Sequence, residues 1–200
     1  MWTDGWVALD TETTGFGSKA RIVELACVTY ERGEVVREWT QLLYPEDVDW
    51  SDRNVMKALE VNGIKHAELV GKPTFRDVLG DLLVELSHPV WVAHNASFDI
   101  SMMNQELQRL GHPALSPQLL ICTKNLASGL NNTAVGNRLS DVACRYNVLQ
   151  EGAHRAAADA ITCSRVLARM VEQGLLPSDD DSMKALCMRN HSNWQHKHRW

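Results

Sequence analysis

The sequence predicts an α/β domain built around a mixed β-sheet. Three segments with strand-like patterning come first, and helical and strand-like segments alternate after them. A chain of 200 residues can bury a core without disulfides or structural metals. Its composition, 44% hydrophobic and 22% charged, is typical of a folded globular domain.

Local signals place the elements in order along the chain. Strands are expected at residues 6–10, 22–30, 35–44, 90–93 and 119–122. Helices are expected at residues 52–59, 74–86, 97–111, 139–146 and 153–173. Arg32-Gly33-Glu34 is the predicted hairpin turn, Thr74 and Ser97 are predicted N-caps, and Gly174 ends the last helix.

Two segments are expected to be irregular. Residues 125–137 are rich in glycine and asparagine, which predicts a mobile loop. From Pro177 onward an acidic run precedes a His/Trp-rich end, which favours a loosely attached tail. We therefore expect a domain at residues 1–176 and a tail at residues 177–200 that is flexible or binds a partner.

Composition argues against several classes of protein. No apolar run approaches the roughly 20 residues of a membrane helix, and the N-terminus lacks the features of a signal peptide. The five cysteines are scattered without a C-x-x-C pair, which favours reduced thiols and a cytoplasmic location. The net charge of −5 argues against a broadly basic nucleic-acid coat, but it allows a local cleft neutralised by metal.

Asp10 and Glu12 follow the first apolar run. In a strand their side chains leave the same face, with Cα atoms about 7 Å apart. Two like charges this close raise each other's pKa or bind a cation, and Mg²⁺ prefers carboxylate oxygens. The alternative interpretation is a polar strand end that runs into the turn Thr13-Thr14-Gly15.

Asp99 and Asp159 each lie on the apolar face of a predicted helix. Asp99 shares its stripe with Met103, Leu107 and Leu110, and Asp159 shares its stripe with Cys163, Val166 and Met170. A carboxylate on the core side needs a partner, because burying an unpaired charge is costly. For Asp99 the alternative is an acidic residue that simply favours the helix dipole.

His154 lies five residues before Asp159, roughly 140° around a helix, so it cannot share that stripe. We expect it in the first turn or in the preceding loop. An imidazole near a metal site on a movable segment suits a general base. A surface histidine at a helix start is the alternative. Four inward carboxylates would repel one another unless divalent cations neutralised them, and two metal ions roughly 4 Å apart are a recurring device for phosphodiester cleavage.

These residues form three motifs in order. Residues 10–15 (Asp-Thr-Glu-Thr-Thr-Gly), residues 94–99 (His-Asn-Ala-Ser-Phe-Asp) and His154 with Asp159 resemble the motifs of the DEDDh (DnaQ-like) 3′–5′ exonucleases. Residues 63–64, 72–75 and 137–146 look like the proofreading (epsilon) subunits of bacterial DNA polymerase III. The resemblance runs from about residue 6 to 174. It implies an RNase H-like fold, with a central five-stranded mixed sheet flanked by helices.

The resemblance also implies roles for single residues. Asp10, Glu12 and Asp159 would hold the catalytic metal, Asp99 would support a second ion through water, and His154 would deprotonate the attacking water. The cofactors would be two Mg²⁺ or Mn²⁺ ions per active site. The implied substrate-binding residues are Thr13, Thr14, Gly15, Phe98, Asn95 and Asn62. Asn62 stands where epsilon-type chains often carry histidine, which puts substrate affinity in doubt more than chemistry.

The expected activity is release of nucleoside 5′-monophosphates from 3′ ends, preferably of single-stranded or frayed DNA. Two alternatives are an exoribonuclease of the RNase T or oligoribonuclease type and a catalytically inactive module that binds 3′ ends. A polymerase or another replication or repair protein is the expected partner in trans, and no membrane association is expected. We expect Arg138, Arg155 and residues 125–137 to line the nucleic-acid path.

Overall fold

The computed structural model describes residues 1–130, 136–150, 152 and 154–197, with side chains up to residue 189. Within these residues five strands form one mixed sheet in the order β3-β2-β1-β4-β5. The strands are β1 (Gly5–Thr13), β2 (Ile22–Glu31), β3 (Glu34–Leu42), β4 (Val90–Ala93) and β5 (Leu119–Cys122). β2 is antiparallel to β1 and to β3, whereas β4 is parallel to β1 and to β5. The expected five-stranded mixed sheet is confirmed.

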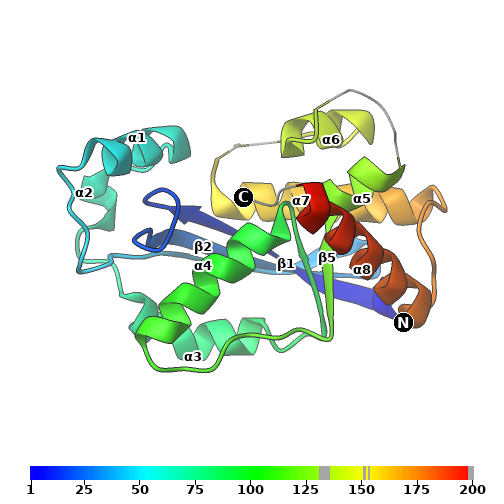
Figure 1. Cartoon of the computed structure of the whole chain (residues 1–200), viewed down its shortest axis with the longest axis horizontal. Helices are drawn as coiled ribbons and strands as arrows, with labels where there is room; N and C mark the ends of the chain where they lie inside the picture. The colour runs from blue at the N-terminus through cyan, green and yellow to red at the C-terminus, as the bar shows by residue number, and fades with distance from the viewer. Residues whose placement is uncertain (131–135, 151, 153, 198–200) are drawn as a thin grey trace.

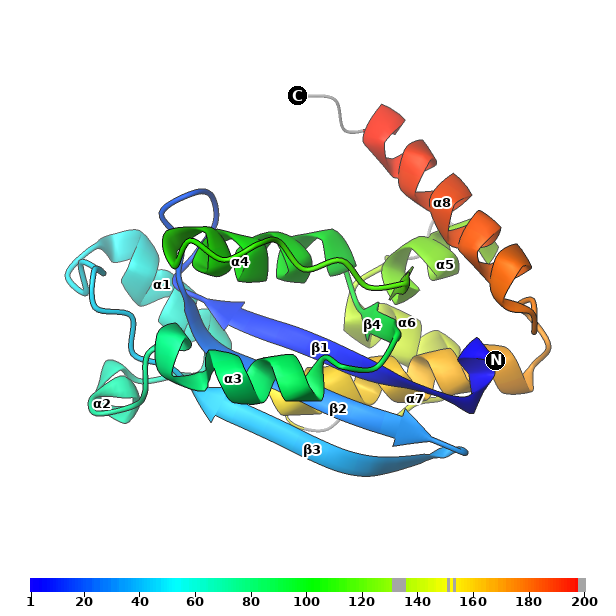
Figure 2. The same ribbon diagram turned by 90° about the horizontal axis from the view of Figure 1, so that it is seen from below.

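Helices cover both faces of the sheet (Figure 1). They are α1 (Arg53–Asn62), α2 (His66–Leu69), α3 (Phe75–Glu85), α4 (Ala96–Arg109), α5 (Thr123–Leu130), α6 (Leu139–Arg145), α7 (Ala156–Glu172) and α8 (Asp180–Lys197), with a 3₁₀ turn at Trp2–Asp4. α7 runs along one face, and α3 and α4 pack on the other (Figures 1 and 2). In the described chain no helix combines the length and apolarity needed to span a bilayer.

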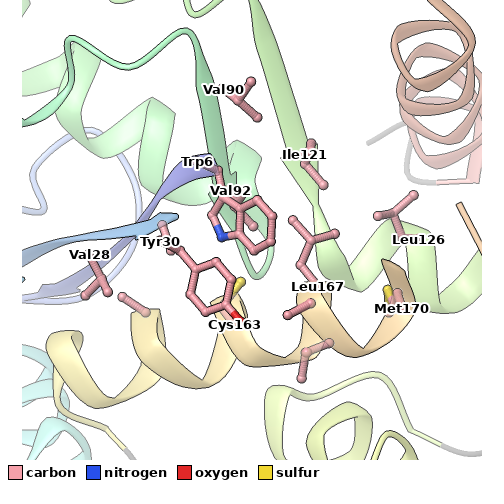
Figure 3. Close-up of a cluster of buried hydrophobic side chains, with 14 of the residues drawn as sticks. Trp6, Val28, Tyr30, Val90, Val92, Ile121, Leu126, Cys163, Leu167 and Met170 are labelled. Carbon is pink, nitrogen blue, oxygen red and sulfur yellow. The ribbon is translucent and has the colours of Figure 1, made fainter. Parts of the chain in front are cut away.

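Side chains along β1 point alternately to the two faces of the sheet and contribute to the hydrophobic cluster on each face. Trp6 and Ala8 belong to the cluster under α7, and Val7 and Leu9 belong to the cluster under α3 and α4. Figure 3 shows the first cluster, in which the ring of Trp6 stacks on that of Tyr30 with centroids 4.6 Å apart. Residues of α7 belong to the same cluster, so α7 packs along β1 and β2.

Several local predictions are confirmed. Arg32 and Gly33 have φ values of 51° and 93° and connect β2 to β3 in a two-residue turn, where glycine tolerates the positive φ. Thr74 caps α3 in a capping box, since Asp77 Oδ2 accepts a hydrogen bond of 2.8 Å from the Thr74 backbone N–H. These signals depend on neighbouring residues only.

The predicted start of α4 is wrong by two residues. Asn95, and not Ser97, occupies the N-cap position, with φ 75°. Only His94 and Asn95 connect β4 to α4, so the chain must turn sharply, and asparagine tolerates the left-handed conformation that this turn requires.

The predicted loop at residues 125–137 is wrong in its first half. α5 covers residues up to Leu130, because Thr123, Leu126 and Ala127 are buried at the helical spacing i, i+3 and i+4. Residues 131–135 lie outside the described residues. Residues 136–137 are described, and the backbone oxygen of Asn137 lies 2.9 Å from His94 Nε2.

The segment after Pro177 also differs from a loosely attached tail. Residues 180–197 form α8, which contacts α5 and β5, and the side chain of Met183 is fully buried. Asp180 Oδ1 accepts a hydrogen bond of 2.7 Å from the Trp2 backbone N–H. The C-terminal half of α8 points away from the sheet (Figure 2).

Candidate active site

The site is built on the second half of β1. Asp10 and Glu12 lie inside this strand, which stays paired with β2 up to Thr13. β4 pairs with Val7 and Ala8 of β1, and beyond Ala8 no strand among the described residues pairs with this edge of β1. The start of α4 fills this position.

Asp99, in the first turn of α4, hydrogen-bonds to β1 at this unpaired edge. Its Oδ1 accepts hydrogen bonds from the Thr11 backbone N–H at 3.0 Å and from Thr11 Oγ1 at 2.9 Å. The carboxylate thus provides the partner that a strand would have given to the Thr11 N–H. Asp99 is 2% exposed, and burial raises its pKa to about 7 although the bonds from Thr11 act in the opposite direction.

Asp159 in the first turn of α7 completes a carboxylate cluster with β1. Oxygen atoms of Asp10, Glu12 and Asp159 all lie within 4.8 Å of one another. Burial, followed by the charges of Asp99, Glu12 and Asp159, holds the pKa of Asp10 well above its usual range. Burial and the charge of Asp159 raise the pKa of Glu12 to about 8.

This donor set fits divalent metal ions. Carboxylate oxygens from a rigid strand and a rigid helix are the ligands that Mg²⁺ and Mn²⁺ prefer. Burial first, and then the convergence of negative charges, raise the pKa values of Asp10 and Glu12, and a bound cation would favour the charged forms. Three of the four predicted metal ligands form the cluster, and the fourth, Asp99, lies beside it on Thr11.

His154 lies in the loop immediately before α7, as expected. It is exposed and has φ 64°, a left-handed conformation that is uncommon outside glycine and is often found at functional sites. Its backbone N–H donates to Asp159 Oδ2 at 3.2 Å, and Gln150 Nε2 donates to Asp159 Oδ1 at 2.8 Å. The histidine backbone and the Asp159 carboxylate are therefore directly connected.

The predicted substrate-binding threonines stabilise the turn after β1. Thr13 Oγ1 donates to the Gly15 oxygen at 2.7 Å, and Thr14 Oγ1 accepts from the Arg21 backbone N–H at 3.0 Å. Asn62 is buried and its Nδ2 donates to the Thr13 oxygen at 3.0 Å. Gly15 has φ 138°, which favours glycine.

Phe98 has an aromatic neighbour that sequence reasoning missed. Phe16, at the tip of the same turn, is 89% exposed, and its ring meets that of Phe98 edge-on with centroids 5.7 Å apart. The sequence offered a signal for this exposed ring. Phe16 lies between Gly15 and Gly17 in a predicted turn, where a large apolar side chain cannot be buried in the core. Asn95, also predicted to bind substrate, accepts a hydrogen bond of 3.3 Å from Lys124 Nζ.

A buried ion pair fixes this turn, and sequence reasoning missed it too. Glu106 in α4 is 2% exposed and accepts hydrogen bonds from Arg21 Nε at 2.8 Å and from Arg21 Nη2 at 3.0 Å. Arg109 Nη2 donates to the Ser18 oxygen at 2.7 Å. The turn that carries Phe16 is therefore tied to the helix that carries Phe98.

The chain is similar in sequence to known proteins. The exonuclease family model matches residues 7–167. The DNA polymerase III subunit epsilon of Treponema pallidum (strain Nichols) is 30% identical over 172 residues, which cover 83% of this chain and 76% of that protein.

Two solved structures have a similar fold. Exonuclease X in complex with 5′ overhanging duplex DNA has a TM-score of 0.67 at 24% identity, and the match covers 91% of this chain and 99% of that one. The nuclease domain of 3′hExo, a DEDDh family member bound to rAMP, has a TM-score of 0.72 at 15% identity over 86% of this chain and 94% of that one. The chain therefore belongs to the exonuclease family, with a DNA polymerase III epsilon (DnaQ-like) subunit among its relatives, and it has the RNase H-like fold.

Proposed function

We propose that this exonuclease is a metal-dependent 3′–5′ enzyme that releases nucleoside 5′-monophosphates, preferably from single-stranded or frayed DNA. The observation that carries the proposal is the convergence of Asp10, Glu12 and Asp159 within 4.8 Å at the unpaired edge of β1. DNA is preferred because the Treponema relative is a DNA polymerase subunit and Exonuclease X was solved with duplex DNA.

The proposed chemistry assigns a task to each group. Asp10, Glu12 and Asp159 would hold the metal ions, and Asp99, whose Oδ1 accepts both hydrogen bonds from Thr11, would support the second ion. When bound, two Mg²⁺ or Mn²⁺ ions would supply an acidified attacking water and stabilise negative charge on the leaving oxygen. His154 takes a proton from the water that attacks the terminal phosphorus. The P–O3′ bond breaks, the leaving O3′ takes a proton from solvent, and the shortened strand ends in a new 3′-hydroxyl.

The turn after β1 is the proposed seat of the 3′-terminal nucleotide. Phe16 and Phe98 offer an aromatic corner beside it, and stacking on such rings tolerates any base. Thr13, Thr14 and Gly15 offer backbone groups to the sugar, and Asn62 holds their conformation from behind. Asn95 lies at the start of α4 beside Phe98.

Shortening of labelled polymers tests the proposal. With Mg²⁺ or Mn²⁺, 5′-labelled single-stranded DNA is expected to give a ladder of single-nucleotide steps from the 3′ end, and EDTA is expected to stop it. Duplex DNA and RNA are assayed in parallel. RNA is included because the nuclease domain of 3′hExo was solved with bound rAMP. Faster loss from RNA would make the protein an exoribonuclease, and binding of 3′ ends without shortening would make it a binding module. Internal cuts would contradict the 3′–5′ direction.

Replacing His154 tests its role as the general base. His154→Asn is expected to lower kcat by about 10²–10³-fold, because proton transfer by a positioned side chain contributes about that much. Asparagine tolerates the left-handed backbone at this position, so the Asp159 hydrogen bond should persist. The measurement is kcat on single-stranded DNA with saturating metal, and full activity in His154→Asn would remove the histidine from the mechanism.

A further inference from the structure

Glu24 is a buried carboxylate close to the carboxylate cluster. The proposed reaction gives Glu24 no role. It lies on β2 directly opposite Glu12 in the antiparallel register and is 1% exposed. Residues opposite each other in such a pair project from the same face, so Glu24 faces the start of α7, as Glu12 does. A fully buried charge so close to other carboxylates requires strong partners.

Those partners come from the segment that joins His154 to α7. Arg155 donates to Glu24 through Nε at 3.1 and 3.2 Å and through Nη2 at 2.7 Å. The backbone N–H of Ala156, the first residue of α7, donates to Glu24 Oε2 at 3.0 Å. Arg155 was expected to line the nucleic-acid path. The structure pairs it with Glu24 and leaves 46% of its side chain exposed.

Glu24 therefore caps α7 from a neighbouring strand. The N-cap position belongs to Arg155, whose own side chain makes no capping bond. A carboxylate at this position satisfies a free backbone N–H and interacts favourably with the helix dipole. Because Glu24 is part of β2, it fixes the start of α7 against the sheet, in which the neighbouring strand β1 carries Asp10 and Glu12.

The segment held in this way carries His154 on one side and Asp159 on the other. Asp159 accepts the His154 backbone N–H at 3.2 Å, so the histidine, the ion pair and the aspartate form one connected unit. The charge of Arg155 opposes the rise in the pKa of Glu12 that burial and the neighbouring carboxylates cause, which places its positive charge near the cluster.

We propose that Glu24 and Arg155 are positioning residues for the exonuclease reaction, whose ion pair holds the start of α7 so that Asp159 and His154 meet Asp10 and Glu12. The inference rests on the proposed function and adds two residues that do not touch the reacting atoms. Loss of the pair should displace catalytic groups and leave the seat of the 3′ end intact. Because a misplacement of about 1 Å can cost about 10²-fold in rate, Arg155→Ala should lower kcat by about 10–100-fold with KM nearly unchanged.

The test compares Arg155→Ala and Arg155→Lys with Arg165→Ala. Arg165 is exposed, lies on α7 and lines the same groove as Arg155, so its variant controls for the loss of one positive charge. We expect Arg155→Lys to recover much of kcat and Arg165→Ala to match the parent. Arg155→Ala should also need more Mg²⁺ for half-maximal rate, which a purely structural role at temperatures below unfolding would not produce.

Amide hydrogen exchange gives a readout that does not depend on activity. Exchange at residues 154–159 should be faster in Arg155→Ala than in the parent and unchanged in Arg165→Ala. Unchanged kcat and unchanged exchange in Arg155→Ala, with an active parent, would overturn the positioning role alone. A parent that shortens no polymer would overturn the proposed function instead, and the exchange data would then decide whether the pair holds the start of α7.

Discussion

Asp159→Asn is expected to lower the exonuclease rate by about 10³-fold or more while leaving the fold intact. Asparagine keeps the shape of the side chain and removes one charged ligand from the cluster with Asp10 and Glu12. A metal ion contributes several kcal/mol of transition-state stabilisation, and about 4 kcal/mol corresponds to 10³-fold. The measurement is the single-turnover rate on single-stranded DNA at saturating Mg²⁺.

Thermal unfolding separates this loss from misfolding. Asp159 and Glu12 repel each other, since the charge of Asp159 raises the pKa of Glu12. Without metal, Asp159→Asn should therefore unfold at the same temperature as the parent or higher. Asp81→Asn, at an exposed position of α3, is the matched control and should keep the full rate. Cleavage that persists in Asp159→Asn would show that the active site lies elsewhere.

Without metal, the protein is expected to lose stability as pH rises from about 5.5 to 8, by about 3 kcal/mol or 6–12 °C in Tm. The pKa of Glu12 is raised to about 8 and that of Asp99 to about 7, so the folded state holds protons that the unfolded state releases near its ordinary carboxyl pKa. A raised pKa in the folded state gives stability at low pH, which is lost as pH rises through that value. Above pH 8 the loss from Glu12 should level off.

Divalent cations should offset this loss of stability at high pH. Mg²⁺ or Mn²⁺ binds the deprotonated carboxylates, so the gain in Tm on adding metal should be larger at pH 8 than at pH 6. Glu12→Gln removes one titrating group and should flatten the metal-free profile, which separates the cluster from the rest of the chain. A metal-free Tm that rises with pH across this range would contradict the raised pKa values.

Much of the fold could be predicted because its signals are local. The turn at Arg32 and Gly33, the cap at Thr74 and the short strands β4 and β5 each depend on neighbouring residues. The errors arose where composition was given more weight than spacing. Glycine and asparagine around residues 125–137 were given more weight than the helical spacing of Thr123, Leu126 and Ala127 in α5. Likewise, the polar composition at the end of the chain was given more weight than the single apolar residue Met183, which is buried and anchors α8.

The sequence by itself determined the carboxylates of the site and the elements that carry them. Periodicity is a property of one element, so the inward faces of Asp99 and Asp159 and the shared face of Asp10 and Glu12 could be read directly. Only the tertiary structure decided what surrounds them. The pairing of Glu24 with Arg155, and of Glu106 with Arg21, joins residues more than 80 positions apart. Such pairs depend on how the sheet and the helices pack, because no local sequence pattern predicts which two buried charged side chains form an ion pair.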